Sequence, residues 1–450
     1  MMRESPFRLL PRPEPLALAG RRVLVLGLGD TGLSVARYAE RHGARVRVAD
    51  TRAKPPRLAE FAGDVHLGPF SHALLADVDL VCISPGLSLA EPLVAEALAR
   101  GIPVLGDVEL FAWQNRAPVL AITGTNGKST VTALTGHLLR TAGIDAEVAG
   151  NISPPVLDAL MKRSAPPAAW VLELSSYQLE TAWSLNPRAA TVLNLSEDHL
   201  DRYASLADYG AAKARIFEGD GVQVLNRDDA GTLAMARPGR PVVTFGLDVP
   251  TGRNYGVRAG VLLEGEELIV EASALPIHGA HNVANALAAC ALTRAFGVPR
   301  ERLREGLASF RGLPHRLELV ARRGSVDWYD DSKGTNVGAT IAALRGLGKR
   351  AVLILGGEGK GQDFAPLRAP VAEFASRVML IGRDAPVIEA ALAGLPLERC
   401  PSLEQAVERA ARIARPGEAV LLSPACASFD MFRDYRHRGE VFAAAVRGLP

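Results

Sequence analysis

The sequence predicts an α/β protein whose parallel sheets are covered by helices. Short runs rich in Val, Ile and Leu alternate with longer stretches of Ala, Leu and Arg at helical spacing. Strands buried on both faces of a parallel sheet are almost continuously apolar, and the connections between them are usually helical. The chain has 450 residues, of which 48% are hydrophobic and 22% charged, so roughly two to four domains with cores of their own are expected.

The apolar runs and helical stretches can be placed in order along the chain. A strand at 23–28 precedes a helix at 33–41, and a strand at 119–123 precedes a helix at 131–139. Short alternating segments with Gly turns at 252–271 indicate a small antiparallel part. The remaining strands are expected at 80–84, 171–174, 191–195, 222–225, 352–355 and 378–381.

Two seams divide the chain into three predicted domains. Residues 113–118 lie just before a strand, and residues 311–315 contain Gly312 and Pro314 before a new series of strands. We therefore expect an N-terminal domain at 1–112, a central domain at 113–312 and a C-terminal domain at 313–450.

Composition narrows the class of protein. Basic residues number 51 and acidic residues 49, so binding to nucleic acid is not expected. Four distant cysteines without metal-ligand spacing argue against a zinc site or a disulfide framework and favour a cytoplasmic location. The run 23–28 is too short for a signal sequence or a membrane span, so no membrane insertion is expected. Near-neutral charge without a coiled-coil pattern favours a monomer.

The first glycine-rich loop, residues 27–32, reads Gly-Leu-Gly-Asp-Thr-Gly between a strand and a helix, and Asp50 follows about 20 residues later. Glycines allow the turn, the helix N-terminus attracts phosphate and the acid can hold a ribose hydroxyl. The pattern indicates a dinucleotide, another nucleotide or a nucleotide sugar. A tight turn without a ligand is the structural alternative.

The second loop, residues 123–130, reads Thr-Gly-Thr-Asn-Gly-Lys-Ser-Thr, again between a strand and a helix. Ile122 stands where the longer phosphate-loop pattern has Gly, but the working parts remain. Backbone N–H groups receive phosphate oxygens, Lys128 supplies positive charge to the β- and γ-phosphates, and Ser129 can bind Mg²⁺. The loop predicts ATP binding, and a glycine turn followed by a solvated lysine is the alternative.

Three further polar residues follow predicted elements. Glu173 ends an apolar strand, where a carboxylate can meet Mg²⁺ at the sheet edge. His199 lies in an acidic stretch that a surface turn would also explain. Lys213 falls on a predicted helix, where the residues alone favour a solvated side chain.

In this order the loops resemble the Mur ligases of bacterial cell-wall synthesis, and the resemblance covers nearly the whole chain. The branch that adds D-glutamate is indicated by Gly-Gly at 356–357 with Lys360 and by the stretch 422–439. The segments that carry the family resemblance are Gly-Thr-Asn-Gly-Lys-Ser-Thr at 124–130, Glu-Leu-Ser-Ser at 173–176, the stretch 194–201, Lys213, His-Asn-Val-Ala-Asn at 281–285, His315-Arg316 and Asp-Ser-Lys-Gly-Thr-Asn at 331–336.

The resemblance implies a Rossmann-like UDP-binding domain, a P-loop-like ATPase domain and a Rossmann-like amino-acid-binding domain. It also implies that ATP phosphorylates the alanyl carboxylate of UDP-N-acetylmuramoyl-L-alanine and that the amine of D-glutamate displaces the phosphate. The implied cofactors are ATP, two Mg²⁺ ions and CO₂, the last as a carbamate on Lys213. The implied metal ligands are Ser129, Glu173, His199 and the carbamate of Lys213.

The same resemblance assigns residues to each ligand. At two positions the sequence departs from the family pattern: Asp30 replaces a more neutral residue, and Tyr435 replaces a Phe. The implied catalytic residues are Lys128, Glu173, His199 and Lys213. Those for ATP are Gly124, Thr125, Asn126, Gly127, Lys128, Ser129, Thr130, Asn282, Asn285, Arg316 and Asp331. Those for the UDP-sugar are Asp30, Thr31, Asp50, Thr51, Arg52, Ser84, Gly86 and Asn151, and those for D-glutamate are Lys333, Thr335, Lys360, Ser428 and Tyr435.

Lysine is rare in this arginine-rich chain, with seven lysines among the 51 basic residues. Lys128, Lys213, Lys333 and Lys360 all fall in motifs with an expected role. Arg cannot form a carbamate, and its planar fork is a poor substitute for a compact ammonium at a phosphate. Retained lysines therefore mark the expected ATP, metal and glutamate sites.

Two functions of other classes are weaker alternatives. A nicotinamide-dependent oxidoreductase would rest on residues 27–32 and Asp50 alone and would leave Lys128 and Lys213 without a role. A nucleotide-sensing or scaffold protein would keep the ATP loop without needing Glu173, His199 and Lys213 together.

Overall fold

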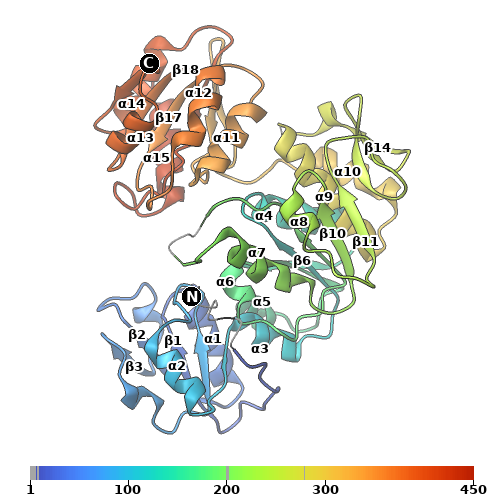
Figure 1. The fold of residues 1–450 in the computed structure, drawn as a ribbon, viewed down its shortest axis with the longest axis vertical. Helices are drawn as coiled ribbons and strands as arrows, with labels where there is room; N and C mark the ends of the chain where they lie inside the picture. Colours follow the sequence, from blue (N-terminus) through green and yellow to red (C-terminus); the bar gives the residue numbers. More distant parts are fainter. Residues whose placement is uncertain (1–6, 8–9, 199–201, 278, 450) are drawn as a thin grey trace. The chain divides into compact units, whose positions relative to one another are not determined.

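The computed structural model describes residue 7 and residues 10–198, 202–277 and 279–449. Its architecture is α/β, as predicted, with strands in three sheets (Figure 1). Among the described residues, none of the helices is both long and apolar enough to cross a bilayer.

The N-terminal sheet has five strands in the order β3-β2-β1-β4-β5, and its strand pairs are parallel. The order reverses between β1 and β4, so the carboxyl ends of these strands form the topological switch point at which such sheets bind ligands. The elements are β1 (Arg22–Leu26), α1 (Asp30–Arg41), β2 (Arg45–Asp50), η2 (Leu58–Glu60), β3 (Asp64–Leu67), η3 (His72–Leu75), β4 (Leu80–Ile83), α2 (Pro92–Ala99), β5 (Val104–Leu105) and α3 (Asp107–Gln114).

The central sheet has nine strands in the order β14-β13-β12-β11-β10-β9-β6-β8-β7. β6 (Val119–Thr123) lies between β8 (Ala169–Glu173) and β9 (Ala189–Val192), is parallel to both and is buried along its whole length. The other elements are α4 (Lys128–Thr141), β7 (Ala146–Gly150), α5 (Val156–Lys162), α6 (Ser176–Leu179), α7 (Leu206–Ala214), η4 (Arg215–Phe217), β10 (Val222–Asn226), α8 (Ala230–Leu233), β11 (Val242–Phe245), β12 (Tyr255–Arg258), β13 (Val261–Glu264), β14 (Glu267–Glu271), η5 (Ala272–Ala274), α9 (Ala280–Phe296), η6 (Arg300–Arg302) and α10 (Leu303–Ser309).

The expected antiparallel part at 252–271 corresponds to β12, β13 and β14. These strands are neighbours in the sheet and follow one another through two-residue turns, a connection that only antiparallel strands allow. The prediction for this segment is confirmed.

The C-terminal sheet has six strands in the order β15-β16-β20-β17-β18-β19. β15 and β16 are antiparallel, and the other strand pairs are parallel. The elements are β15 (Glu318–Arg323), β16 (Val326–Asp330), α11 (Val337–Gly346), β17 (Ala351–Gly356), η7 (Ala365–Leu367), α12 (Arg368–Phe374), β18 (Ala375–Ile381), α13 (Ala385–Ala391), β19 (Leu397–Arg399), α14 (Leu403–Ile413), β20 (Ala419–Leu422) and α15 (Tyr435–Arg447).

The chain forms two compact units. The first contains the N-terminal sheet and most of the central sheet, and the second contains the C-terminal sheet together with the first turns of α9. The domain limits at 112/113 and 312/313 stay a prediction.

Candidate active site

The phosphate loop runs from the end of β6 to the start of α4. Gly124 and Gly127 have positive φ angles of 149° and 83°, a region that residues with a Cβ rarely adopt. A Cβ on Gly124 would also lie only 3.0 Å from the Cβ of Leu193. α4 has no side-chain cap at its N-terminus, so backbone N–H groups there can face an anion.

Asn194 holds this loop in shape from the neighbouring strand end. Its Oδ1 accepts from the N–H of Asn126 at 2.8 Å, and its Nδ2 donates to the carbonyl of the same residue at 3.1 Å. Its own carbonyl accepts from the N–H of Thr125 at 3.0 Å. We expected a strand at 191–195 but assigned Asn194 no role. Its position directly after β9, beside the loop, explains why an amide with both donor and acceptor occurs there.

Lys128 and Lys213, both expected to be catalytic, donate to the same backbone carbonyl. Lys128 Nζ and Lys213 Nζ each donate to the carbonyl of Gly124 at 2.9 Å. Lys213 is 1% exposed, so the expectation of a solvated lysine, drawn from the residues alone, is wrong. Burial and then the charge of Lys128 place the pKa of Lys213 well below its usual value, although Asp198 and Glu173 oppose this change.

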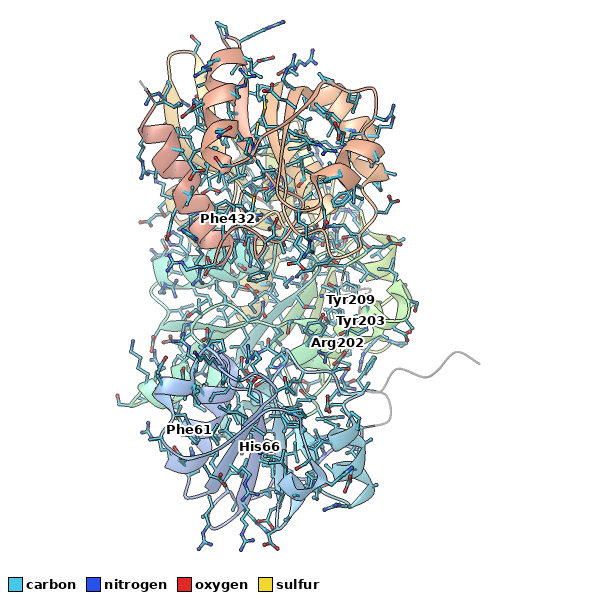
Figure 2. The ribbon with its side chains drawn as sticks, turned by 90° about the vertical axis from the view of Figure 1, so that its left-hand side faces the viewer. Phe61, His66, Arg202, Tyr203, Tyr209 and Phe432 are labelled. Atoms are coloured by element: carbon cyan, nitrogen blue, oxygen red, sulfur yellow. The ribbon has the colours of Figure 1, made fainter. Side chains whose placement is uncertain are left out.

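An aromatic ring lies against the buried lysine. Lys213 Nζ lies 4.3 Å from the ring centroid of Tyr209, and Tyr209 packs against Tyr203 with ring centroids 5.2 Å apart. Figure 2 shows the two tyrosines close to Arg202. Burial keeps water from the amine, and this desolvation is the largest cause of its lowered pKa.

Glu173 ends β8 with its side chain buried, and the residue is 2% exposed. Its Oε1 accepts from Asn151 Nδ2 at 2.6 Å, while its buried Oε2 has no hydrogen-bond partner within the described part of the chain. A buried carboxylate oxygen without a partner is unfavourable unless a cation binds it. The donor set around the phosphate loop therefore fits a hard divalent ion.

Asn151, expected to contact the UDP-sugar, is bonded to Glu173 by both its side chain and its backbone. Its N–H also donates to the carbonyl of Glu173 at 2.8 Å, and a Cβ on the preceding Gly150 would lie 2.2 Å from that carbonyl oxygen. Its expected contact with the UDP-sugar stays a prediction. His199, one of the expected metal ligands, lies outside the described residues.

At the switch point of the N-terminal sheet, Asp50 is fully engaged. Its oxygens accept from the N–H of Leu28 at 2.7 Å and from the N–H, Nε and Nη2 of Arg52 at 2.9, 2.8 and 2.7 Å. Burial alone would raise the pKa of Asp50, but the hydrogen bonds from Arg52 and Leu28 outweigh burial and lower that pKa to about 2. Ser84 Oγ donates to the carbonyl of Gly27 at 3.1 Å and closes the loop from β4. The structure thus brings these expected UDP-site residues together.

The start of α1 carries an ion pair that the sequence did not reveal. Arg57 Nε donates to Asp30 Oδ1 at 2.6 Å, and Arg57 Nη1 donates to Glu60 Oε1 at 2.7 Å. The neighbouring Thr31 is partly exposed, while Thr51 is exposed. Arg57 lies 27 residues after Asp30, and no sequence pattern connects them.

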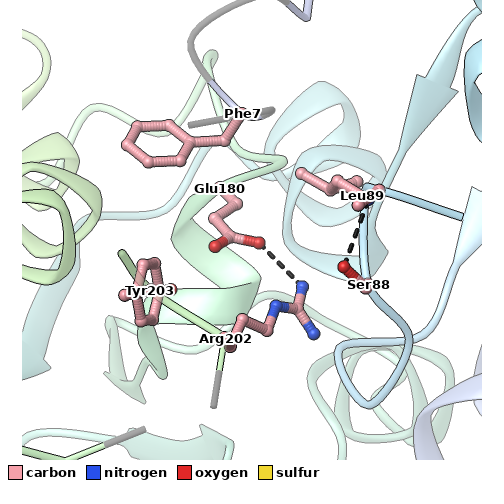
Figure 3. Close-up of a pocket in the computed structure, with 7 residues that line it drawn as sticks. Phe7, Ser88, Leu89, Glu180, Arg202 and Tyr203 are labelled. Atoms are coloured by element: carbon pink, nitrogen blue, oxygen red, sulfur yellow. Dashed lines mark hydrogen bonds and ion pairs between the residues drawn. The ribbon is translucent and has the colours of Figure 1, made fainter. Parts of the chain in front are cut away.

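A cavity of about 160 Å³ lies beside the segment that follows β4 of the N-terminal sheet (Figure 3). Arg202 borders it, donates to Glu180 Oε2 at 2.8 Å and to the carbonyl of Pro85 at 3.0 Å, and so ties the central part of the chain to the loop that carries Ser84 and Gly86. The residues that line the cavity are Phe7, Ser88, Leu89, Ala90, Glu180, Arg202 and Tyr203.

In the second compact unit, Asp331 lies in a partly buried turn after β16. Ser423 Oγ donates to its Oδ2 at 2.6 Å and the N–H of Leu317 to its Oδ1 at 3.2 Å. Burial raises the pKa of Asp331 to about 7, although Ser423 and the charge of Arg316 act in the opposite direction. Asn282 and Asn285 lie one turn apart on α9, and Asn285 Nδ2 donates to Asn282 Oδ1 at 3.1 Å.

The loop that follows Asp331 is fixed by a buried arginine. Arg438, 0% exposed, donates to Ser332 Oγ at 2.9 Å, to the Ser332 carbonyl at 2.7 Å and to the Cys426 carbonyl at 3.1 Å. Burial lowers the pKa of Arg438 to about 10.

Lys333 lies over an aromatic ring, with its Nζ 3.9 Å from the ring centroid of Tyr435. The N–H of Thr335 donates to the carbonyl of Lys333 at 2.9 Å. The Tyr435 ring also meets the ring of His315 edge-on, so the Tyr435 side chain is packed against a neighbour. The hydroxyl of Tyr435 accepts from Arg436 Nε at 3.3 Å.

Two further residues expected to bind D-glutamate lie in the loops that follow β17 and β20 of the C-terminal sheet. Lys360 has a positive φ angle of 53° and its Nζ lies 6.0 Å from the ring of Phe429. Ser428, directly before that ring, is buried. Phe429 itself is 64% exposed, which leaves an apolar surface beside the two polar groups.

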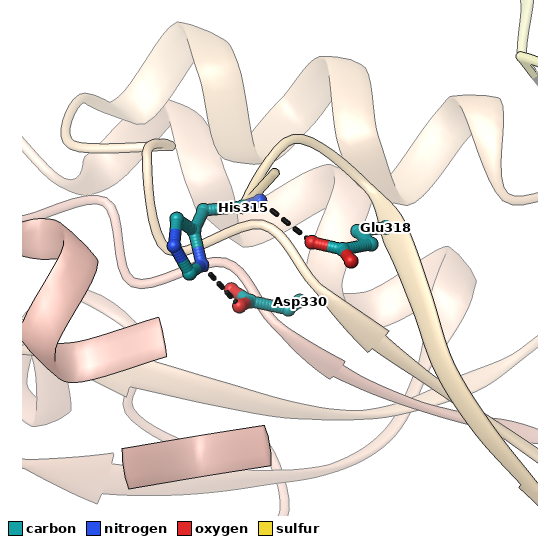
Figure 4. Close-up of side chains that lie close together, drawn as sticks. All are labelled: His315, Glu318 and Asp330. Carbon is teal, nitrogen blue, oxygen red and sulfur yellow. Dashed lines mark hydrogen bonds and ion pairs between the residues drawn. The ribbon is translucent and has the colours of Figure 1, made fainter. Parts of the chain in front are cut away.

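His315, Glu318 and Asp330 cluster at the start of the C-terminal sheet (Figure 4). His315 Nδ1 and Asp330 Oδ2 are 2.7 Å apart, and the hydrogen bond to Asp330 raises the pKa of His315. The N–H of His315 donates to Glu318 Oε2 at 2.9 Å. Hydrogen bonds within the cluster account for this geometry, and a Cβ on Gly439 would lie 2.2 Å from the imidazole.

Comparison with known proteins identifies three matching domain families. They are the Mur ligase MurD-like N-terminal domain at residues 21–106, the Mur ligase middle domain at 122–293 and the Mur ligase glutamate ligase domain at 315–426. The chain is 58% identical to the UDP-N-acetylmuramoylalanine–D-glutamate ligase of Thiobacillus denitrificans, with 97% of this chain and 98% of that protein covered. It is 54% identical to the enzyme of the same name from Nitrosospira multiformis, with 96% of each covered.

Solved structures agree on the fold. The chain matches the UDP-N-acetylmuramate–alanine ligase of Thermotoga maritima with a TM-score of 0.63 at 20% identity, covering 95% of this chain and 99% of that one. It matches a pseudomurein peptide ligase of Methanothermus fervidus with a TM-score of 0.57 at 18% identity, covering 90% and 96%.

Proposed function

This chain belongs to the Mur ligase family, and on that premise we propose how its residues carry out the family's chemistry. It is an ATP-dependent amide ligase that adds D-glutamate to UDP-N-acetylmuramoyl-L-alanine in peptidoglycan synthesis. A cytoplasmic location is part of the proposal, because its reactants are ATP and a UDP-linked precursor and its four cysteines are buried and unpaired.

The reaction has two steps, phosphoryl transfer from ATP and then amide formation. An oxygen of the alanyl carboxylate attacks the γ-phosphorus of ATP, the bond to the bridging oxygen breaks and ADP leaves, which gives an acyl phosphate. The amine of D-glutamate then attacks the acyl carbon, loses a proton and expels inorganic phosphate as the amide forms. Both steps bring anions together, so positive charge and fixed donors matter more than acid-base groups.

The phosphate loop binds the triphosphate. Lys128 exchanges its donation to the Gly124 and Thr125 carbonyls, at 2.9 and 2.8 Å, for phosphate oxygens when ATP binds. Asn194 keeps the loop in the conformation that directs its N–H groups at the ligand. The nucleoside end of ATP is assigned to Asn282, Asn285, Arg316 and Asp331.

Mg²⁺ would be held by Ser129 and Glu173 at one position and by His199 and a carbamate of Lys213 at a second. When bound, the ions neutralise charge on the phosphate oxygens. The unpartnered Oε2 of Glu173 supports the first position.

Lys213 is suited to carbamate formation. The nitrogen of an amine must lose its proton before it can attack CO₂, and burial beside Lys128 lowers the pKa of Lys213. The N–C bond that forms releases a proton and leaves an anionic oxygen donor in place of a cation. That exchange also removes the repulsion between two ammonium groups at the Gly124 carbonyl.

The ends of the substrates are assigned to the remaining site residues. Asp50, Arg52, Ser84 and the loop 27–32 lie together at the switch point of the N-terminal sheet, which supports their assignment to the UDP moiety. D-Glutamate carries two carboxylates, and Lys333 and Lys360 offer two cations for them, with Thr335, Ser428 and Tyr435 beside these lysines.

Two observations carry the proposed mechanism. Lys128 and Lys213 share the Gly124 carbonyl, and in the same compact unit the buried Oε2 of Glu173 has no hydrogen-bond partner among the described residues. The test is phosphate release measured with ATP and Mg²⁺. Release is expected only when UDP-N-acetylmuramoyl-L-alanine and D-glutamate are both present. Release with a different amino acid in place of D-glutamate would indicate another ligase of this family.

A further inference from the structure

The start of α1 presents a negative charge where a diphosphate is expected. Asp30 is the first residue of α1, and the helix N-terminus has no side-chain cap. Backbone N–H groups there attract phosphate. Asp30 is 64% exposed at this end, and a carboxylate repels a bound diphosphate.

Arg57, in an adjacent loop, forms an ion pair with Asp30. Its Nε lies 2.6 Å from Asp30 Oδ1, and its N–H donates to the carbonyl of Leu28 at 3.3 Å, so the loop that carries it is attached to the glycine-rich turn itself. Its Nη1 is held by Glu60 at 2.7 Å, and Glu60 in turn lies 3.4 Å from Arg37. The side chain is therefore fixed at two points beside the helix start.

The other charges near the turn are already balanced. Asp50 is committed to Arg52 and to the N–H of Leu28. Among the described residues, Arg57 is thus the cation that neutralises Asp30. Arg57 is 41% exposed, so the pair is open to solvent and to a ligand.

We propose that Arg57 is a positioning residue for the diphosphate of the UDP-linked substrate: it neutralises Asp30, so that the N-terminus of α1 can accept an anion. The proposal rests on the proposed function, because it takes the diphosphate to bind at this turn. It also accounts for how the chain tolerates an acid at position 30. Loss of Arg57 leaves Asp30 uncompensated, whereas loss of both residues restores a neutral helix start.

The test is a double-mutant cycle of Arg57→Gln, Asp30→Asn and the double variant in the phosphate-release assay. Arg57→Gln is expected to raise KM for the UDP-linked substrate about fivefold, with kcat and the KM for ATP and D-glutamate close to wild type. The double variant is expected to recover most of that loss. Arg57→Lys, which keeps the charge, should stay close to wild type.

Two further readouts separate charge compensation from a merely structural role. UDP binding, measured by calorimetry, should weaken in Arg57→Gln, whereas binding of uridine, which has no phosphate, should not. The UDP effect should shrink at about 1 M salt, where the screening length falls to roughly 3 Å. Arg21→Gln is the matched control, since Arg21 forms another surface pair with Asp79 at 3.4 Å, at the start of β1.

Several results would overturn the proposal that Arg57 compensates the charge of Asp30. A double variant as impaired as Arg57→Gln overturns the compensation and leaves direct contact by Arg57 instead. Equal losses for UDP and uridine, or no change in Arg57→Gln, also overturn it. If the wild type binds UDP but releases no phosphate, the proposed reaction fails while the UDP and uridine comparison still tests Arg57. If the wild type releases phosphate but does not bind UDP, the inference about Arg57 fails while the proposed function stands.

Discussion

Replacing Asp50 by Asn tests the central contact of the N-terminal sheet. The carboxylate accepts four hydrogen bonds, from Leu28 and Arg52, and Asn offers only one acceptor oxygen. The pKa of Asp50 is lowered from its ordinary value of 3.8 to about 2. A pKa that differs by one pH unit between the folded and unfolded states corresponds to about 1.4 kcal/mol. The ionised Asp50 therefore contributes about 2 kcal/mol to the free energy of unfolding at neutral pH.

The sign of the pH dependence follows from the lowered pKa. The stabilisation is fully present above pH 3.8 and is lost as the pH falls through the folded-state value of about 2, so roughly half remains at pH 3. Asp50→Asn should therefore lower the melting temperature of the first compact unit by about 4 °C at pH 7, since a unit of this size moves about 2 °C for each kcal/mol. At pH 3 the difference between variant and wild type should be clearly smaller.

Scanning calorimetry at the two pH values makes the comparison. Asp79→Asn is the matched control, because Asp79 accepts from Arg22 N at 2.8 Å but its side chain is 37% exposed. It should cost less than about 1 kcal/mol. A shift below about 1 °C in Asp50→Asn at pH 7, or an equal shift at both pH values, would refute the reasoning.

Three other predictions concern the remaining parts of the site. Lys213→Ala should reduce kcat by roughly 10²- to 10³-fold, and a short carboxylic acid should restore part of the activity in the phosphate-release assay; full activity without any acid would contradict the carbamate. Asn194→Ala should raise KM for ATP about tenfold or more, because two hydrogen bonds to Asn126 are lost, and an unchanged KM would contradict its role in shaping the loop. The pKa of Asp331 is raised to about 7, so this carboxyl should make the free energy of unfolding of the wild type fall as pH rises from about 4 to 7. Urea unfolding should show this fall in the wild type and not in Asp331→Asn. The same dependence of the free energy of unfolding on pH in both proteins would contradict the prediction.

The sequence predicted the interior of each sheet better than its edges. β6, β17 and β20 are buried apolar runs, and two of these three were expected from their composition alone. β3 and β15 were missed because they are edge strands that carry charged residues. Edge strands are half exposed, so they lack the continuous apolar run by which the others were found.

The site divides in a similar way. Loops at strand ends could be found because glycines and a lysine follow one another in the chain, as at 123–130. The burial of Lys213 and the contact between Arg57 and Asp30 could not be found, since they join residues that only the fold brings together. The resemblance to a family placed Lys213 in the site, but not its shared contact with the Gly124 carbonyl.

The most direct test of the central claim follows one oxygen atom through the reaction. UDP-N-acetylmuramoyl-L-alanine labelled with ¹⁸O in its alanyl carboxylate is incubated with the enzyme, ATP, Mg²⁺ and D-glutamate. If the carboxylate attacks ATP to form an acyl phosphate, the inorganic phosphate released carries ¹⁸O, visible as an isotope-shifted ³¹P signal. Unlabelled phosphate, formed together with the amide product, would contradict the account.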